Sequence, residues 1–179
     1  MLNDVVLVNS QDVQIGVCNK RIAHLGTGKL HRAFSVHLIN SAGHHLLQCR
    51  AAGKMLWPGF WSNACCSHPA PGETIMDAAS RRLREELGIS AYCRYIYSFE
   101  YHALYGSIGA ENELCHVLVA QSDDVVYPST EEVSDTTWLT RTEVSARLSE
   151  SEAQFTPWFR MEWRCLLSEY PSFDTVTAN

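Results

Sequence analysis

The stretch from residue 57 to 89, WPGFWSNACCSHPAPGETIMDAASRRLREELGI, limits most strongly how this chain can fold. Its second half predicts a helix that begins after Thr74, a favourable N-cap residue, and ends at Gly88. Asp77 is in the position of a capping-box partner, three residues after Thr74. Apolar residues at helical spacing predict one face packed on a core: Met76, Ala79, Leu83 and Leu87. The first half is an aromatic loop with Pro and Gly that leads into the tetrapeptide CCSH at residues 65–68.

The other face of the predicted helix is charged. It carries Arg81, Arg82, Arg84, Glu85 and Glu86, with two oppositely charged pairs four residues apart. One interpretation is a solvated helix face, on which each pair contributes only a few tenths of a kcal/mol. The other is a helix face with a function. Charge pattern alone leaves both interpretations open.

Strands are predicted on both sides of this helix. Alternating apolar residues and turn signals indicate strands at residues 4–8, 13–16, 33–39, 45–50, 92–101, 114–120 and 133–139. Two further helices are predicted at residues 141–148 and 158–167, the second behind Thr156 and Pro157. At 179 residues without a linker or repeat, we expect a single domain over residues 1–179, with a loose tail at 172–179.

Composition excludes several classes of protein. The chain is 46% hydrophobic and 19% charged, which is typical of a soluble globular protein. We expect no membrane span, because no apolar run approaches about 20 residues. The first residues lack the basic region of a signal peptide, so we expect a cytoplasmic protein. A net charge of −6 argues against nucleic acid as a partner. Seven cysteines without CxxC spacing favour reduced thiols.

The segment around the predicted helix resembles the Nudix box. Glu73 takes the position of its first Glu, and the terminal run is matched by Arg81, Leu83, Glu85, Glu86, Gly88 and Ile89. Two positions depart, because Ser67 replaces the first Gly and Arg82 replaces the second Glu of the run. These departures, together with NACCSH, resemble the type I isopentenyl-diphosphate isomerases, which are Nudix-fold proteins that isomerise rather than hydrolyse. The resemblance covers residues 4–167 and implies an α/β fold, a Nudix-type α/β/α sandwich with a mixed sheet.

The resemblance also implies a metal site. The motifs AHLGTGKLHRAF, CCSHP and ENE supply residues of the types that hold one divalent ion (Mn, Zn or Mg) in that family: His24, His31, His68, Glu111 and Glu113. By spacing alone each histidine is more commonly structural, since zinc sites use close Cys/His pairs. Glu111 and Glu113 would face the same side of an extended segment and could share one ion. The alternative for that pair is a solvated strand end.

Four residues match the family's catalytic positions. The resemblance assigns a catalytic thiol to Cys66 and a proton-exchanging carboxylate to Glu113, with Tyr101 bonded to that carboxylate. Trp158 would stabilise a cationic state with its ring face, an effect of about 2 kcal/mol or more when desolvated. The alternative for Cys66 is an inert buried thiol, and the alternative for Trp158 is ordinary core packing; the residues alone leave both open.

Four cations match positions that bind the substrate diphosphate: Lys20, Arg50, Lys54 and Arg82. Individually each is a surface charge, but Arg82 is informative because it replaces a Glu of the Nudix hydrolases. The resemblance implies that Glu86 holds a Mg²⁺ ion that bridges to the diphosphate. A flavin is not expected, because the chain contains no G-x-G-x-x-G fingerprint.

The predicted function is metal-dependent interconversion of isopentenyl and dimethylallyl diphosphate through Cys66 and Glu113, in isoprenoid biosynthesis. The partner is then a small prenyl diphosphate, and we expect a monomer or weak dimer. A Nudix hydrolase of an organic or nucleoside diphosphate is the alternative; Arg82 and a cysteine without a role in hydrolysis argue against it. A non-catalytic diphosphate-binding module would have lost ligands or the acid/base pair, and none is lost.

Overall fold

The computed structural model describes residues 4–175. Its strands are β1 (Asp4–Val8), β2 (Gln14–Asn19), β3 (His31–Ile39), β4 (His44–Arg50), β5 (Trp61–Asn63), β6 (Cys65–Ser67), β7 (Cys93–Tyr105), β8 (Gly109–Gln121) and β9 (Val133–Thr140). Its helices are α1 (Lys20–Ala23), α2 (Ile75–Leu87), α3 (Arg141–Ser151) and α4 (Pro157–Glu169), and a 3-10 turn, η1 (Glu152–Gln154), lies between the last two.

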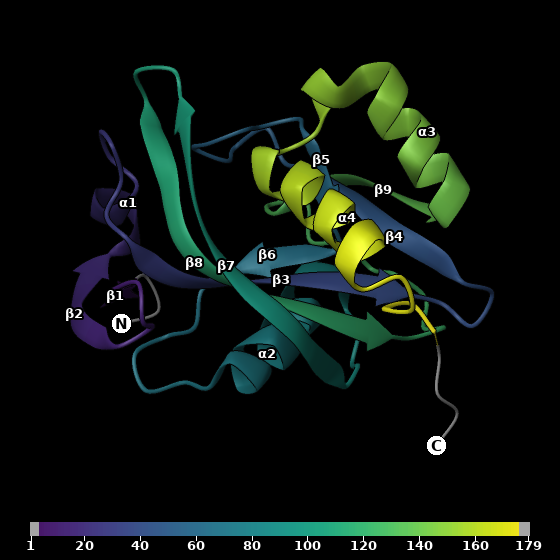
Figure 1. Ribbon diagram of the computed structural model, residues 1–179, viewed down its shortest axis with the longest axis horizontal. Coiled ribbons are helices and arrows are strands. Elements are labelled where there is room, and N and C mark those ends of the chain that lie inside the picture. Colours follow the sequence, from purple (N-terminus) through teal and green to yellow (C-terminus); the bar gives the residue numbers. More distant parts are fainter. Residues whose placement is uncertain (1–3, 176–179) are drawn as a thin grey trace.

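The strands form one mixed sheet with β3 at its centre (Figure 1). β3 pairs antiparallel with β1, β4 and β6, and parallel with β8. β7 and β8 form a long antiparallel hairpin, and β4 also pairs with β5 and β9. The parallel β3–β8 register places His31 opposite Glu113. This pairing brings the start of β3 and the first half of β8 together, and the candidate site lies there.

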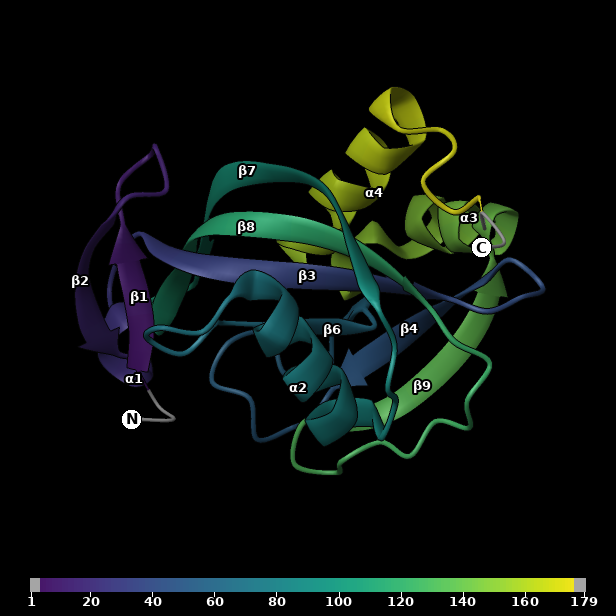
Figure 2. The ribbon, with the colours of Figure 1, turned by 90° about the horizontal axis from the view of Figure 1, so that it is seen from below.

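Helices cover both faces of the sheet, as Figure 2 shows with α2 on one side and α3 and α4 on the other. Successive side chains along β3 point to opposite faces of the sheet, so β3 contributes to the core on each face. Phe34, Val36 and Leu38 pack in the core under α2, with Leu83 and Leu87 of that helix. Ile39 packs in the second core with α4. The Nudix-type α/β/α sandwich with a mixed sheet is therefore confirmed.

The central helix begins and ends as the sequence predicts. The Thr74 hydroxyl accepts the Asp77 N–H, and Gly88 adopts a left-handed φ of 71° that lets its N–H reach the carbonyls of the last turn. One residue of the predicted apolar face differs, since Met76 is 36% exposed whereas Ala78 is buried. Full burial on α2 begins at Ala78, and before it only the half-buried Ile75 packs against the core.

Four short elements were not predicted: β5 and β6 lie in the stretch read as a loop, α1 precedes the first metal-ligand candidate, and η1 follows α3. The predicted loose tail, residues 172–179, is described only as far as residue 175. Phe173 is buried, with its ring against Trp163 and under the Arg141 guanidinium. Residues 176–179 lie outside the described part. Within residues 4–175, no helix is both long enough and apolar enough to cross a membrane.

Candidate active site and metal centre

A cavity of about 810 Å³ opens beside the β7–β8 hairpin. It gathers most of the predicted site residues, from elements far apart in sequence: Lys20, His24, Arg50, Lys54, Cys66, His68, Tyr101, Glu111, Glu113 and Trp158. His31 is fully buried and hydrogen bonds to the wall residue His68. Arg82 lines an adjoining cavity of about 130 Å³ instead, together with Lys20 and His68. Glu86 is buried next to Arg82.

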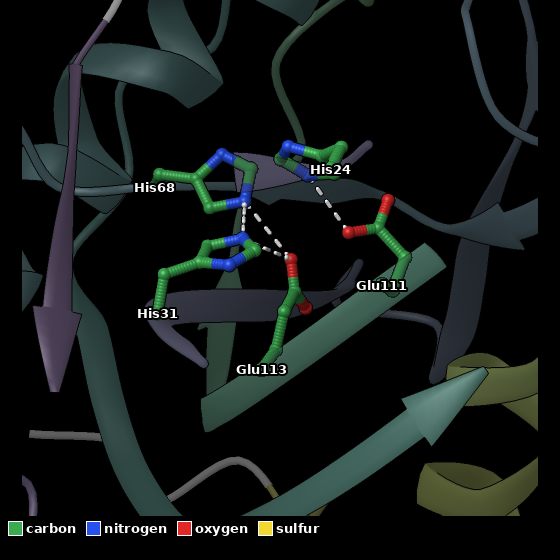
Figure 3. Close-up of side chains that lie close together, drawn as sticks. All are labelled: His24, His31, His68, Glu111 and Glu113. Carbon is green, nitrogen blue, oxygen red and sulfur yellow. Dashed lines mark hydrogen bonds and ion pairs between the residues drawn. The ribbon is translucent and has the colours of Figure 1, made fainter. Parts of the chain in front are cut away.

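Five of these residues converge in one cluster (Figure 3). Each offers one ligand atom, and the five atoms lie within 4.8 Å of one another: His24, His31, His68, Glu111 and Glu113. The histidines come from the end of α1, the start of β3 and the residue after β6, and both carboxylates come from β8. As predicted for an extended segment, Glu111 and Glu113 face the same side, and neither is a solvated strand end.

Backbone carbonyls orient two of the imidazoles. Nδ1 of His24 lies 2.6 Å from the Lys20 carbonyl oxygen, and Nδ1 of His31 lies 2.7 Å from that of Lys29. A carbonyl can only accept, so both Nδ1 atoms carry a proton. In the neutral rings Nε2 therefore presents its lone pair to the cluster. This is how metal-ligating histidines are generally oriented by their surroundings.

The remaining distances fit a shared cation. His31 Nε2 lies 3.0 Å from His68 Nε2, and His24 Nε2 lies 2.9 Å from a Glu111 oxygen. Burial, followed by the nearby charges of Lys20 and His31, lowers the pKa of His68 well below its usual value. The His68 Nδ1 atom is buried and has no hydrogen-bond partner in the described part of the chain. Three imidazoles and two carboxylates at this spacing fit one divalent ion.

Cys66 lies on the same cavity wall between two polar groups. Its thiol donates to Asn63 Oδ1 at 2.8 Å and accepts from the Trp158 indole N–H at 3.1 Å. Burial, and then the charge of Glu162, raises the pKa of the Cys66 thiol to about 12. Cys66 is therefore a protonated thiol next to the cavity, with a defined direction for its proton.

Tyr101 and Glu113 form a second polar pair in the cavity. The Tyr101 hydroxyl donates to Glu113 at 2.6 Å. Burial alone would raise the pKa of Glu113, but its interactions with His31 and Tyr101 lower it, so the carboxylate is ionised. The ring of Trp158 lies near Tyr101 and carries the Arg50 guanidinium 5.2 Å from its centroid. Trp158 is thus already in a cation–π contact.

Cations gather at one end of the cavity. Burial and the neighbouring positive charges lower the pKa of Lys20, and they lower that of Lys54 to about 8. Arg50 donates to the carbonyls of Leu56 and Trp57, which holds the loop after β4 in place. A lysine with a lowered pKa regains its charge most readily when an anion binds beside it. This end of the cavity therefore favours an anionic ligand.

Arg82 is held by three carboxylates. Its guanidinium donates to Glu85 at 2.7 Å, to Glu86 at 2.7 Å and to Glu132 at 2.8 Å, and Glu132 also pairs with Lys54. Because Glu86 is only 1% exposed, the reading of this helix face as solvated is wrong for Glu86. Arg81 and Glu73 form a separate pair at 2.7 Å that ties α2 to the loop before it.

Sequence reasoning missed several polar residues next to the site. Asn63, Ser35 and Glu162 surround Cys66 on the side of α4, and Glu132 faces Lys54 and Arg82. Glu162 left a signal, since it is a charged residue at an apolar position of the helix that contains Trp158, Phe159 and Trp163. Glu132 left none, because it stands in an irregular segment without periodicity.

Comparisons with known proteins agree with this geometry. The family model of the NUDIX domain matches residues 29–159. A curated relative from Photorhabdus laumondii, named isopentenyl-diphosphate Delta-isomerase 1, is 42% identical and covers 94% of this chain and 97% of its own. The isopentenyl-diphosphate Delta-isomerase of Nocardia farcinica is 44% identical over 86% of this chain and 89% of its own.

Solved structures share the fold at low sequence identity. A protein from Deinococcus radiodurans superposes with a TM-score of 0.72 at 23% identity, covering 90% of this chain and 98% of that one. A MutT protein from Methanosarcina mazei gives a TM-score of 0.64 at 16% identity, covering 79% and 95%. With the fold, the cavity and the relatives together, the chain belongs to the NUDIX family and, within it, to the isopentenyl-diphosphate Delta-isomerases.

Proposed function

We propose that this protein interconverts isopentenyl diphosphate and dimethylallyl diphosphate, as a monomer or weak dimer that serves isoprenoid biosynthesis in the cytoplasm. One observation carries the proposal: a single cavity is lined by a protonated thiol, Cys66, an ionised carboxylate, Glu113, and a group of cations. Relatives at 42–44% identity named for this reaction support it.

The reaction needs two proton-exchanging groups. Moving the double bond of isopentenyl diphosphate adds a proton to its terminal carbon and removes one from the carbon two bonds away. We assign these transfers to Cys66 and Glu113, which line the same cavity. The tertiary cation formed between the two transfers would lie against the Trp158 ring. Tyr101 would hold Glu113 in position through its 2.6 Å hydrogen bond.

The metal proposed here is a single Mn, Zn or Mg ion held by His24, His31, His68, Glu111 and Glu113. When bound, such an ion supplies positive charge that favours the ionised forms of its ligands and of nearby acids. The carbonyls of Lys20 and Lys29 keep two imidazoles in the tautomer that can bind it. Four of the five residues are buried.

We assign the diphosphate to the cationic end of the cavity. Lys20 and Lys54 would regain full charge as the anion binds, and Arg50 lies between them and Trp158. Arg82 would turn from Glu132 to the diphosphate, which it can bind through two parallel hydrogen bonds. Glu86, buried beside Arg82, would hold a Mg²⁺ ion that accompanies the substrate.

Incubation of the purified, metal-loaded protein with isopentenyl diphosphate, followed by ¹H and ³¹P NMR, tests the proposal. We expect dimethylallyl diphosphate with both phosphates intact. In D₂O, deuterium should enter both isomers at the two exchanging carbons. Release of inorganic phosphate or a monophosphate would instead support a Nudix hydrolase. Binding without turnover would support a diphosphate-binding module and overturn the proposal.

A further inference from the structure

A carboxylate without a role in the chemistry above lies beyond Cys66, outside the cavity. Glu162 of α4 is fully buried, among apolar residues of its own helix such as Phe159 and Trp163. Both of its oxygens are bonded, one to the Ser35 hydroxyl at 2.6 Å and the other to His37 Nε2 at 3.0 Å. A buried carboxylate loses several kcal/mol of solvation, which such partners offset in part. Its position in the core therefore needs an explanation other than packing.

Ser35 connects this carboxylate to Cys66. Its Oγ lies 3.5 Å from Cys66 Sγ and 3.4 Å from Cys115 Sγ. A serine hydroxyl has one proton, and the 2.6 Å bond commits that proton to Glu162. Ser35 therefore presents only lone pairs to Cys66, and it cannot donate to the thiol while Glu162 accepts from it.

The other neighbours of the thiol are fixed as well. The Asn63 amide nitrogen donates to the carbonyls of Val36 and Cys65, at 3.1 and 3.0 Å, which leaves its oxygen facing Cys66. The Trp158 indole donates to the sulfur from another side. Cys66 Sγ is thus held between one donor and one acceptor, with the Ser35 oxygen behind it. The Ser62 hydroxyl, 3.7 Å from the sulfur, donates to the same Asn63 oxygen at 3.0 Å.

We propose that Glu162 is a positioning residue for Cys66, acting through Ser35 with His37 as its second partner. Glu162 fixes the Ser35 oxygen behind the sulfur, and this fixed oxygen keeps Sγ in place beside Asn63. When either Glu162 or Ser35 is removed, the sulfur loses this support and the thiol departs from its direction toward Asn63. The proposal rests on the proposed role of Cys66 in proton exchange. Lys20 and Lys54, assigned to the diphosphate, are not part of this network, so turnover should change and substrate affinity should not.

Four variants separate positioning from packing. Glu162→Leu removes the acceptor, and Ser35→Ala removes the group that transmits its effect. We expect each to lower kcat about 10- to 100-fold at unchanged KM, since small misplacements of a reacting group have effects of this size. The double variant should be no worse than either single one, because both break the same link. Glu162→Gln keeps an acceptor for Ser35 and should recover most of the lost turnover.

Leu166→Ala is the matched control for damage to the core. Leu166 is fully buried on the same helix, one turn further on, and belongs to no polar network. This variant should unfold at a lower temperature because of the cavity it creates, yet keep the wild-type kcat. If Leu166→Ala loses turnover as Glu162→Leu does, general loosening of α4 explains the effect and the proposal is overturned.

A readout without substrate keeps this test separate from the proposed function. The chain has five tryptophans, and the indole N–H signal of Trp158 reports its bond to Cys66 in ¹H–¹⁵N NMR spectra. Ser35→Ala and Glu162→Leu should move this signal in the same direction, and the signal of Trp138 should stay. Wild-type kcat and an unmoved Trp158 signal in Ser35→Ala would overturn the proposal, even if Glu162→Leu failed to fold. An inactive wild type in which the signal still moves would refute the proposed function alone.

Discussion

Gly109 offers a sharp test of how the hairpin places a metal ligand. A Cβ at this position would lie 2.2 Å from the His24 carbonyl oxygen and 3.4 Å from Leu56 Cδ2. Ordinary contacts begin near 3.4 Å, so β8 and His24 would have to separate by about 1 Å. The Ala110 N–H donates to the same carbonyl at 3.0 Å, and this bond would be lost with the separation.

Gly109→Ala should therefore weaken metal binding and lower turnover by about 100-fold, the usual effect of a 1 Å misplacement. Overpacking should also destabilise the fold by about 1–3 kcal/mol. Calorimetric titration of the metal-free protein with Mn²⁺ measures the first effect directly. Gly16→Ala is the matched control, because its added Cβ would meet Leu7 at an ordinary 3.7 Å. Wild-type Mn²⁺ affinity in a folded Gly109→Ala variant would refute the reasoning.

Four further predictions concern single residues. Cys66→Ser should lose about 10²–10⁴-fold in turnover and keep its metal, whereas Cys18→Ser on β2 should behave as wild type in the same NMR assay. Arg82→Ala should raise KM for isopentenyl diphosphate and Arg82→Glu should raise it further; the exposed Arg84→Ala is the control, and an unchanged KM would remove Arg82 from the diphosphate site. Chelation should lower the Tm of the wild type but not that of His31→Ala, which lacks a ligand; equal shifts would contradict the five-ligand cluster. Burial, and then the charge of His37, lowers the pKa of His45 in the folded protein to about 4, below its usual value. The unfolded chain therefore binds a proton at His45 more readily than the folded one, so the free energy of unfolding is unaffected by this group above about pH 6.5 and decreases as pH falls toward 4. Removing that group in His45→Phe should therefore flatten the dependence of Tm on pH across this window, and an unchanged slope would show that His45 does not contribute.

Local features of the fold, such as the two ends of α2, could be predicted from the sequence because their causes are local. Thr74 and Gly88 bound α2 through hydrogen bonds within one turn of the helix, and both act as predicted. β5 and β6 could not be predicted, since a strand of three residues is too short to show a periodicity. Their pairing with β4 and β3 is a tertiary effect, and it fixes the backbone on either side of Cys66.

The site could be predicted only in part from the residues. Same-side placement of Glu111 and Glu113 follows from strand geometry and is seen. That the three histidines meet them depends on which strands pair, and alternation within a strand does not specify its neighbour. The family resemblance supplied that link. Glu162 shows the opposite case: its position in the helix was predicted, but its partner Ser35 lies on β3, and no spacing rule connects the two.

The parallel pairing of β3 with β8 has a consequence for the order in which the chain folds. His31 and Glu113 are opposed in that ladder although they are far apart in sequence, and His68 and His24 come from two other segments. Such a non-local contact forms late, since a long loop must close before any partner is gained. An ion could then bind only to a chain whose sheet is already assembled. The bound ion would then slow unfolding of the native structure and leave the folding rate unchanged.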